Sequence, residues 1–122
     1  MGMIHLARIH DPDDGENGLR FLVERLWPRG VRRADLRFTG WVKDAGPSTG
    51  LRRWFGHRPE RWDEFRQRYD AELDGRPEAW RPVRDAAVSG DVTLLYSSRD
   101  TEHDNAVALR EYLRTHLAAA TP

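Results

Sequence analysis

The sequence contains no cysteine, which excludes disulfide bonds, thiolate nucleophiles and cysteine-ligated metals. Lysine is almost missing too, because Lys43 is the only one among 20 basic residues and arginine supplies the rest. No apolar run approaches the roughly 20 residues that cross a membrane, and residues 1–10 lack the apolar core of a signal peptide. We therefore expect a cytoplasmic protein that has no membrane partner.

An excess of charge of either sign is also missing. The 122 residues include 20 basic and 20 acidic side chains, for a formal net charge of +0. Domains that bind nucleic acid are usually strongly basic, so this balance does not favour such a partner. The length suits one domain over residues 1–122, and five tryptophans argue against disorder.

Three segments are predicted to be strands. Residues 3–9 alternate apolar and polar side chains, residues 20–27 are rich in Phe, Leu and Val, and residues 91–98 carry an unbroken β-favouring run. Runs of the last kind are typical of parallel strands that are covered on both faces. The loop between the first two strands is barely long enough for a crossover, so the sense of their pairing stays open.

The middle and the C-terminal part are predicted to be helical. A short helix is expected between Ser48 as N-cap and Gly56 as stop, followed by a longer helix over residues 59–75 with one apolar stripe. Pro82 conflicts with a third helix, which either kinks there or starts late. Thr101 is the expected N-cap of the last helix. These elements predict a small single α/β domain, with a mostly parallel sheet of few strands flanked by helices.

Arginines follow each predicted strand. Arg8 comes after the first strand, Arg25 and Arg29 after the second, and Arg99 after the third. Open α/β sheets bind ligands beyond the carboxyl ends of their strands, so parallel strands would bring these side chains together. Guanidinium groups hold phosphate and carboxylate through charge-assisted hydrogen bonds, and a helix N-terminus adds a favourable dipole. We expect an arginine-rich cleft for a small anionic ligand, phosphate- or nucleotide-like.

Other residues near these ends are candidates for the same site. Asp100 and His103 are the candidate catalytic residues, because they could orient a ligand or exchange protons. Trp27 could stack on a planar ligand, and Lys43 could bind phosphate at the rim. Ser48 is a further ligand-binding candidate, although its role as N-cap explains it fully and no nucleophile motif surrounds it. No metal site is predicted, since the histidine spacings match no ligand pattern.

Two alternatives stay open, as do the cofactor, the oligomeric state and whether a reaction is catalysed. In one, Arg25 and Arg29 pair with acids such as Glu24 or Asp100 and are purely structural, as in a protein-interaction domain. In the other, the protein is a nucleic-acid or regulatory binding module. The second alternative needs six arginines on one exposed face: Arg20, Arg32, Arg33, Arg37, Arg52 and Arg53.

Three long stretches carry a resemblance to known proteins: "VERLWPRGV", "DAGPSTGLRRWFGHRPERWDEFRQRYDAEL" and "VTLLYSSRDTEHDNAVALREYL". Through them the chain resembles the bacterial YeaO-like family, a branch of the DUF488 group, from about Ile4 to Leu117. The resemblance implies a single small α/β domain whose biochemical activity is not established. The matching motif residues are Arg25, Trp27, Pro28, Arg29, Lys43, Pro47, Ser48, Trp54, His57, Asp100 and His103.

The chain departs from the family pattern at three motif positions. Glu24 stands where the family usually has aspartate, Gly46 where it has alanine, and Asp104 where it has asparagine after the histidine. The longer Glu24 could shift a carboxylate within the site. The resemblance implies that any chemistry requiring the family's aspartate and asparagine would be impaired here.

Overall fold

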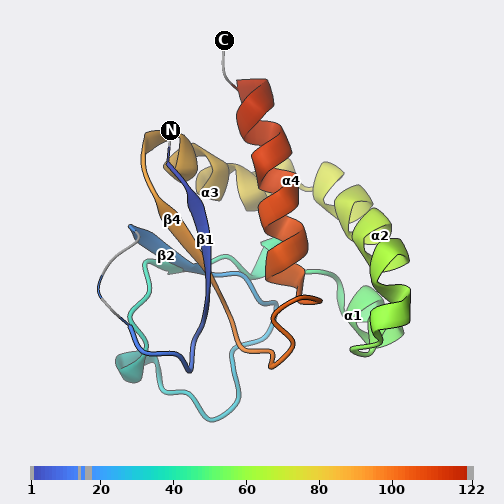
Figure 1. The fold of residues 1–122 in the computed structure, drawn as a ribbon, viewed down its shortest axis with the longest axis horizontal. Coiled ribbons are helices and arrows are strands. Elements are labelled where there is room, and N and C mark those ends of the chain that lie inside the picture. Colours follow the sequence, from blue (N-terminus) through green and yellow to red (C-terminus); the bar gives the residue numbers. More distant parts are fainter. Residues whose placement is uncertain (1, 14, 16–17, 121–122) are drawn as a thin grey trace.

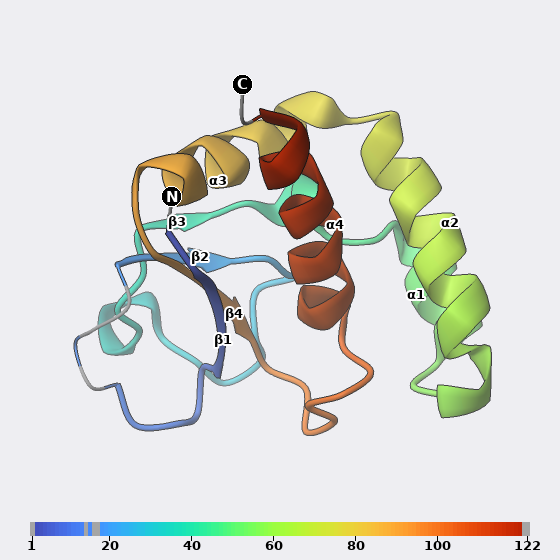
Figure 2. The ribbon, with the colours of Figure 1, turned by 45° about the horizontal axis from the view of Figure 1, so that its top comes forward.

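A sheet of four short parallel strands organises the part of the chain that the computed structural model describes, residues 2–13, 15 and 18–120. The strands are β1 (Ile4–Arg8), β2 (Leu19–Leu22), β3 (Gly40–Trp41) and β4 (Val92–Tyr96). Their order is β1-β4-β2-β3, and each neighbouring pair is parallel (Figure 1 and Figure 2). β1 and β2 therefore do not pair with each other, because β4 lies between them.

The central strand matches its prediction best. All five residues of β4 are buried, as expected for an apolar strand covered on both faces. β2 ends at Leu22, earlier than the prediction that extended to Trp27, and the chain then leaves the sheet toward the pocket described below. β3 has only two residues and was not predicted.

Four α-helices and three short 3₁₀ turns complete the described part. The helices are α1 (Thr49–Phe55), α2 (Trp62–Asp74), α3 (Pro77–Ser89) and α4 (Asn105–Ala120), and the turns are Arg33–Asp35, Lys43–Ala45 and Pro59–Arg61. Figure 2 shows α3 and α4 beside the sheet, with α1 and α2 farther along the same side. None of the described helices is both long and apolar enough to cross a membrane.

The helix ends test the capping predictions. The Ser48 Oγ accepts a hydrogen bond from the Leu51 N–H at 3.1 Å, and Gly56 ends α1 in the left-handed region at φ 55°. The prediction of Thr101 as N-cap of the last helix is wrong. α4 begins at Asn105, and Asp104 caps it by accepting from the Ala106 N–H at 2.8 Å.

Local hydrogen bonds explain the late start of α4. The Asp100 Oδ1 accepts from the backbone N–H groups of Glu102 and His103, at 2.9 and 3.0 Å, and this turn competes with the helix. In α3, Pro82 does not delay the start of the helix. The helix already begins at Pro77 and contains Pro82, so a late start is excluded.

The two faces of the sheet are covered differently. On one face, side chains from all four α-helices form the main core with residues of the sheet. On the other face, Leu22 and Leu95 pack with Leu36 and with Trp27, which come from the loop between β2 and β3. The main core takes these residues from the strands and their ends: Ile4, Phe21, Val23, Val92, Leu94 and Tyr96.

Candidate functional site

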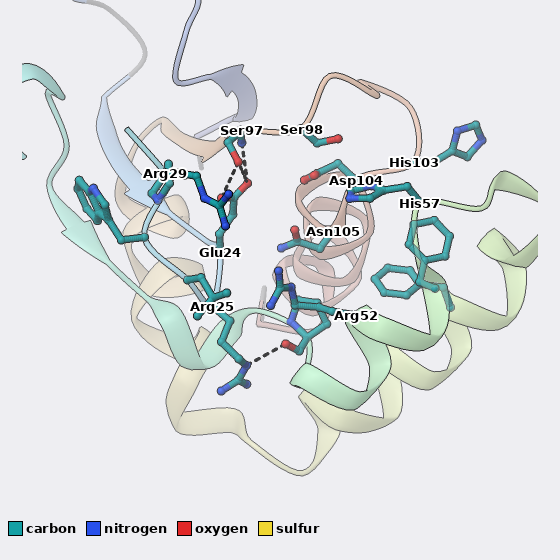
Figure 3. A pocket seen from close by; sticks show the side chains of 16 residues that line it. Glu24, Arg25, Arg29, Arg52, His57, Ser97, Ser98, His103, Asp104 and Asn105 are labelled. Atoms are coloured by element: carbon teal, nitrogen blue, oxygen red, sulfur yellow. Dashed lines mark hydrogen bonds between the residues drawn. The ribbon is translucent and has the colours of Figure 1, made fainter. Parts of the chain in front are cut away.

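A pocket of about 400 Å³ lies at the carboxyl ends of β2 and β4. Three segments form most of its walls, and Phe65 of α2 completes them: residues 24–29 after β2, residues 47–57 in and around α1, and residues 97–105 between β4 and α4 (Figure 3). This is the edge at which a parallel α/β sheet is expected to bind a ligand. The polar lining residues are Glu24, Arg25, Arg29, Arg52, His57, Ser97, Ser98, His103, Asp104 and Asn105.

Three arginines line the pocket, but they are not equivalent. The Arg25 guanidinium donates to the carbonyls of Pro47 and Gly46, at 2.8 and 3.2 Å, and lies 3.9 Å from Asp44. It therefore anchors the loop before α1. Arg29 and Arg52 are exposed, and their guanidinium groups have no hydrogen bond or ion pair to any described residue. Figure 3 shows Arg29 on the Glu24 side and Arg52 on the α1 side.

Glu24 connects the ends of the two central strands. Its Oε1 accepts from the Ser97 N–H at 2.6 Å and from the Ser97 hydroxyl at 2.8 Å, and that hydroxyl also lies 2.8 Å from Oε2. Both carboxylate oxygens are therefore occupied within the described chain. Glu24 forms no ion pair with Arg25 or Arg29 there, so the acid–arginine network considered from the sequence is absent at this point.

Asp104 is the most buried charged group of the pocket, with 7% of its surface exposed. Its Oδ1 caps α4, and its Oδ2 has no hydrogen-bond partner among the described residues. The pKa of Asp104 is raised to about 7, chiefly by burial; the hydrogen bond from the Ala106 N–H opposes this rise, and the nearby charges of Glu24 and Asp100 add to it. Near neutral pH this carboxyl group is therefore present in both protonation states.

Asp100 and His103 form a pair at the rim. The Nδ1 of His103 lies 3.0 Å from the Asp100 Oδ2. Hydrogen bonds from the Glu102 and His103 backbone lower the pKa of Asp100, so its carboxylate stays charged and can orient the imidazole. His103 lines the pocket and packs edge-on against Trp62 at 5.4 Å, whereas Asp100 does not line it. Their catalytic role stays a prediction.

Four predicted ligand-binding residues do not line the pocket. The Arg8 Nε donates to the Ser98 carbonyl at 2.8 Å, which braces the loop after β4 from outside. Lys43 is exposed and lies over the Trp41 ring. The Ser48 hydroxyl bonds to Glu72 and to the start of α1. Arg99 is exposed in the loop before α4.

Trp27 lines the pocket, but its ring is committed to packing. The indole Nε1 donates to the Val31 carbonyl at 2.6 Å, and the ring contacts Phe38 and Trp41 with centroids 5.4 and 5.5 Å apart. The guanidinium carbon of Arg33 lies over the Trp27 ring, 5.0 Å from the ring centroid. A planar ligand could therefore stack only on the part of the Trp27 ring that Arg33, Phe38 and Trp41 do not cover.

Several lining residues were not assigned to the site from the sequence. Ser97 and Ser98 directly follow β4, so the same positional argument that selected Arg99 could have selected them. The Asn105 Nδ2 donates to the Val23 carbonyl at 2.9 Å. Asn105 could be assigned to the pocket only if the start of α4 at this residue was known. Nothing in the sequence around Arg52 indicates that it lines the pocket, because only the packing of α1 brings it to the carboxyl edge of the sheet.

His57 lines the pocket in a conformation that L-residues rarely adopt. Its φ is 56°, directly after Gly56 at 55°. A left-handed conformation costs about 1–2 kcal/mol for a residue with a Cβ, although histidine tolerates it better than most residues. Strain of this kind is concentrated at functional sites.

We expect the two substitutions His57→Gly and His57→Val to differ in sign. Glycine should leave the free energy of unfolding unchanged or raise it by up to about 1 kcal/mol, because it relieves the left-handed strain at φ 56°. Valine should lower the same free energy by about 1–2 kcal/mol. Urea unfolding of both variants checks this, and equal effects would contradict the assigned backbone conformation.

The fold and the pocket define a class: small α/β domains with one parallel sheet and a polar pocket at its carboxyl edge. The chain belongs to the DUF488 family. Residues 3–121 match the family model described as "Inactive DUF488-N3 subclade". The resemblance to YeaO-like proteins is thereby confirmed.

The similar proteins are themselves uncharacterized by name. The chain is 38% identical to Uncharacterized protein YeaO of Escherichia coli (strain K12) over 112 residues, which cover 92% of this chain and 97% of that protein. It is 37% identical to Uncharacterized protein Rv3073c of Mycobacterium tuberculosis (strain ATCC 25618 / H37Rv) over 110 residues, or 90% and 92% of the two chains. No solved structure matches the chain.

Proposed function

We propose that this protein binds a small anionic, phosphate- or nucleotide-like ligand in the pocket and does not chemically transform it. The observation that carries the proposal is the pair Arg29 and Arg52. Both guanidinium groups line one pocket, come from different walls and have no acidic partner among the described residues. A phosphate between them would receive charge-assisted and partly bidentate hydrogen bonds.

Two histidines add donors around the same opening. His57 and His103 both line the pocket, and the Asp100 carboxylate 3.0 Å from the Nδ1 of His103 fixes that ring. A histidine held in this way presents its other nitrogen in a defined direction. We assign His103 to ligand binding, because the matching family model is described as an inactive subclade.

The alternative of a nucleic-acid-binding face has less support. Of the six arginines that it requires, Arg20 and Arg37 both pair with Asp13, at 3.6 and 2.5 Å. Arg32 pairs with Asp35 at 2.9 Å. A phosphate backbone would have to compete with these acids, and the binding would depend steeply on salt.

The proposal predicts that inorganic phosphate stabilises the protein through these two arginines. At about ten times its Kd, a ligand adds about 1.4 kcal/mol to the free energy of unfolding and raises the Tm by about 4–7 °C for a domain of this size. The double variant Arg29→Ala/Arg52→Ala should lose this shift. Differential scanning fluorimetry in increasing phosphate, at constant ionic strength, measures both.

Arg53→Ala is the matched control. Arg53 is exposed and adjacent to Arg52 on α1, but it does not line the pocket, so its removal should leave the phosphate shift intact. Equal losses in the Arg53 variant and in the double variant would mean that phosphate only screens surface charge. No shift with the wild-type protein would refute the proposed function.

A further inference from the structure

We propose that the ligand of this pocket is a phosphorylated pentose, as a free sugar phosphate or as part of a nucleoside monophosphate. Its phosphate lies between Arg29 and Arg52, and a sugar hydroxyl bonds to Asp104. The inference rests on the proposed function and adds the chemistry of the ligand's other end.

The pocket has two chemically different ends. Arg29 and Arg52 are exposed, so the positive charge lies at the opening. Asp104 is buried and Glu24 is half-buried, so the inner wall is rich in carboxylate oxygen. A simple anion that filled the pocket would meet both carboxylates. A ligand that fills it must therefore carry its anionic group at one end and hydrogen-bond donors at the other.

Asp104 is the acceptor that the protein leaves open. Both oxygens of Glu24 accept from Ser97, and the Oδ1 of Asp104 accepts from the Ala106 N–H. The Oδ2 of Asp104 has no partner among the described residues, although this residue is 7% exposed. Among the described residues, the buried side-chain atoms that lack a partner do not include this oxygen, so it is reached from the pocket and is available to a hydrogen-bond donor of a ligand.

A hydroxyl fits this position better than an ammonium group. A hydroxyl both donates and accepts, so it bonds to a carboxylate and to a protonated carboxyl alike, whereas an ammonium group only donates. Because burial raises the pKa of Asp104 to about 7, both of these states occur near neutral pH. Carboxylates at the carboxyl edge of parallel sheets commonly bond to ribose hydroxyls.

The size of the pocket agrees with a phosphorylated sugar. Its volume of about 400 Å³ lies within the range of small-molecule sites, and a phosphate ion alone would leave most of it empty. Ser97 and Ser98 line the pocket in the same segment as Asp104 and Asn105. The Ser97 hydroxyl donates to Glu24 and the Ser98 hydroxyl accepts from the Asp100 N–H, so the first can still accept and the second can still donate to a polyol. Figure 3 shows Asp104 and Asn105 across the pocket from Glu24 and Arg29.

Isothermal titration calorimetry with three phosphate monoesters tests the inference. Ethyl phosphate has the anionic group without hydroxyls, ribose 5-phosphate adds the sugar, and adenosine 5′-monophosphate adds a base. We expect ribose 5-phosphate to bind at least about tenfold more tightly than ethyl phosphate, the change expected for one or two hydrogen bonds in a buried site. Whichever of the two sugar-containing ligands binds more tightly identifies the source of the pentose.

The variant Asp104→Ser tests the assigned residue. Serine retains an oxygen that can cap α4, but it is too short to reach the sugar as well, so the tenfold preference should fall below about threefold. Arg52→Ala should instead weaken all three esters by a similar factor. A preference that persists in Asp104→Ser overturns the assignment to Asp104.

The failures of the two proposals are distinguishable. Equal affinities of the wild-type protein for ethyl phosphate and ribose 5-phosphate would overturn the sugar subsite and leave anion binding standing. The absence of binding for all three esters would overturn both. The comparison of ligands on the wild-type protein does not depend on whether any variant folds.

Discussion

Replacing Asp104 by asparagine is expected to raise the free energy of unfolding by about 3–4 kcal/mol at pH 8. The carboxyl group is 7% exposed, and its pKa rises from 3.8 in the unfolded chain to about 7 in the folded protein. Each pKa unit corresponds to about 1.4 kcal/mol, so ionising Asp104 in the folded state costs stability at neutral and higher pH. Asparagine has nearly the same shape, keeps the N-cap and carries no charge.

The predicted gain in the free energy of unfolding depends on pH, because the pKa of Asp104 is higher in the folded protein than in the unfolded chain. Between about pH 4 and pH 7 the folded protein retains the proton of Asp104, whereas the unfolded chain releases it. The stability of the wild-type protein therefore falls across this interval and levels off above it. The gain from Asp104→Asn should be near zero at pH 4 and complete at pH 8, as measured by urea unfolding at both values.

Asp100→Asn is the matched control, because the same substitution has the opposite expected sign. Backbone hydrogen bonds from Glu102 and His103 lower the pKa of Asp100, so its charged form stabilises the fold above pH 4. The Asp100 variant should be less stable than the wild type at pH 8, with a smaller difference near pH 3. A gain in both variants would show that general relief of negative charge, and not the burial of Asp104, is responsible.

An ionisable group that lowers the free energy of unfolding is expected mainly at a binding or catalytic site, where its chemistry has a function. Buried carboxyl groups with raised pKa values are concentrated in functional pockets, because folding alone does not favour them. Asp104 occupies a motif position at which the resemblance implies asparagine, so the cost is particular to this chain. A ligand hydroxyl on its open oxygen would offset part of that cost, which links the stability prediction to the proposed sugar subsite.

The elements with strong local signals were predictable from the sequence. The apolar run of β4, and Ser48 and Gly56 at the two ends of α1, depend on neighbours within a few residues, and the structure confirms each. β3 was missed because a strand of two residues, Gly40–Trp41, carries no periodicity. The start of α4 was missed because the Asp100 turn displaces it from Thr101 to Asn105.

The position of the pocket was predictable from the sequence, but only some of the residues that line it were. The rule that parallel sheets bind ligands at their carboxyl edge led to Arg25, Arg29 and His103, which do line the pocket. Position along the chain does not reveal where a guanidinium group points. The Arg25 guanidinium donates to the Pro47 carbonyl, and the Arg8 guanidinium donates to the Ser98 carbonyl. Those contacts depend on loops that only the folded chain brings together.

The variant Phe65→Ala is expected to lower the free energy of unfolding by about 3–5 kcal/mol, the range for removing a buried phenylalanine side chain. Phe65 is 2% exposed, and its ring lies 4.5, 5.5 and 5.6 Å from the rings of Phe55, Trp62 and Tyr69. Each of these neighbours would lose contact with it and face a cavity. A marginally stable domain of this size has a total of about 5–15 kcal/mol, so the variant should unfold at much lower urea.

Leu26→Ala separates packing from mere proximity to the pocket. Leu26 also lines the pocket with an apolar side chain, but it is 59% exposed, so its removal should change the free energy of unfolding by less than about 0.5 kcal/mol. Urea unfolding of both variants, with comparison of their m-values, measures the difference. Similar small effects would mean that the aromatic wall of α1 and α2 is loosely packed, and such a wall could not hold Arg52 and His57 in place around a ligand.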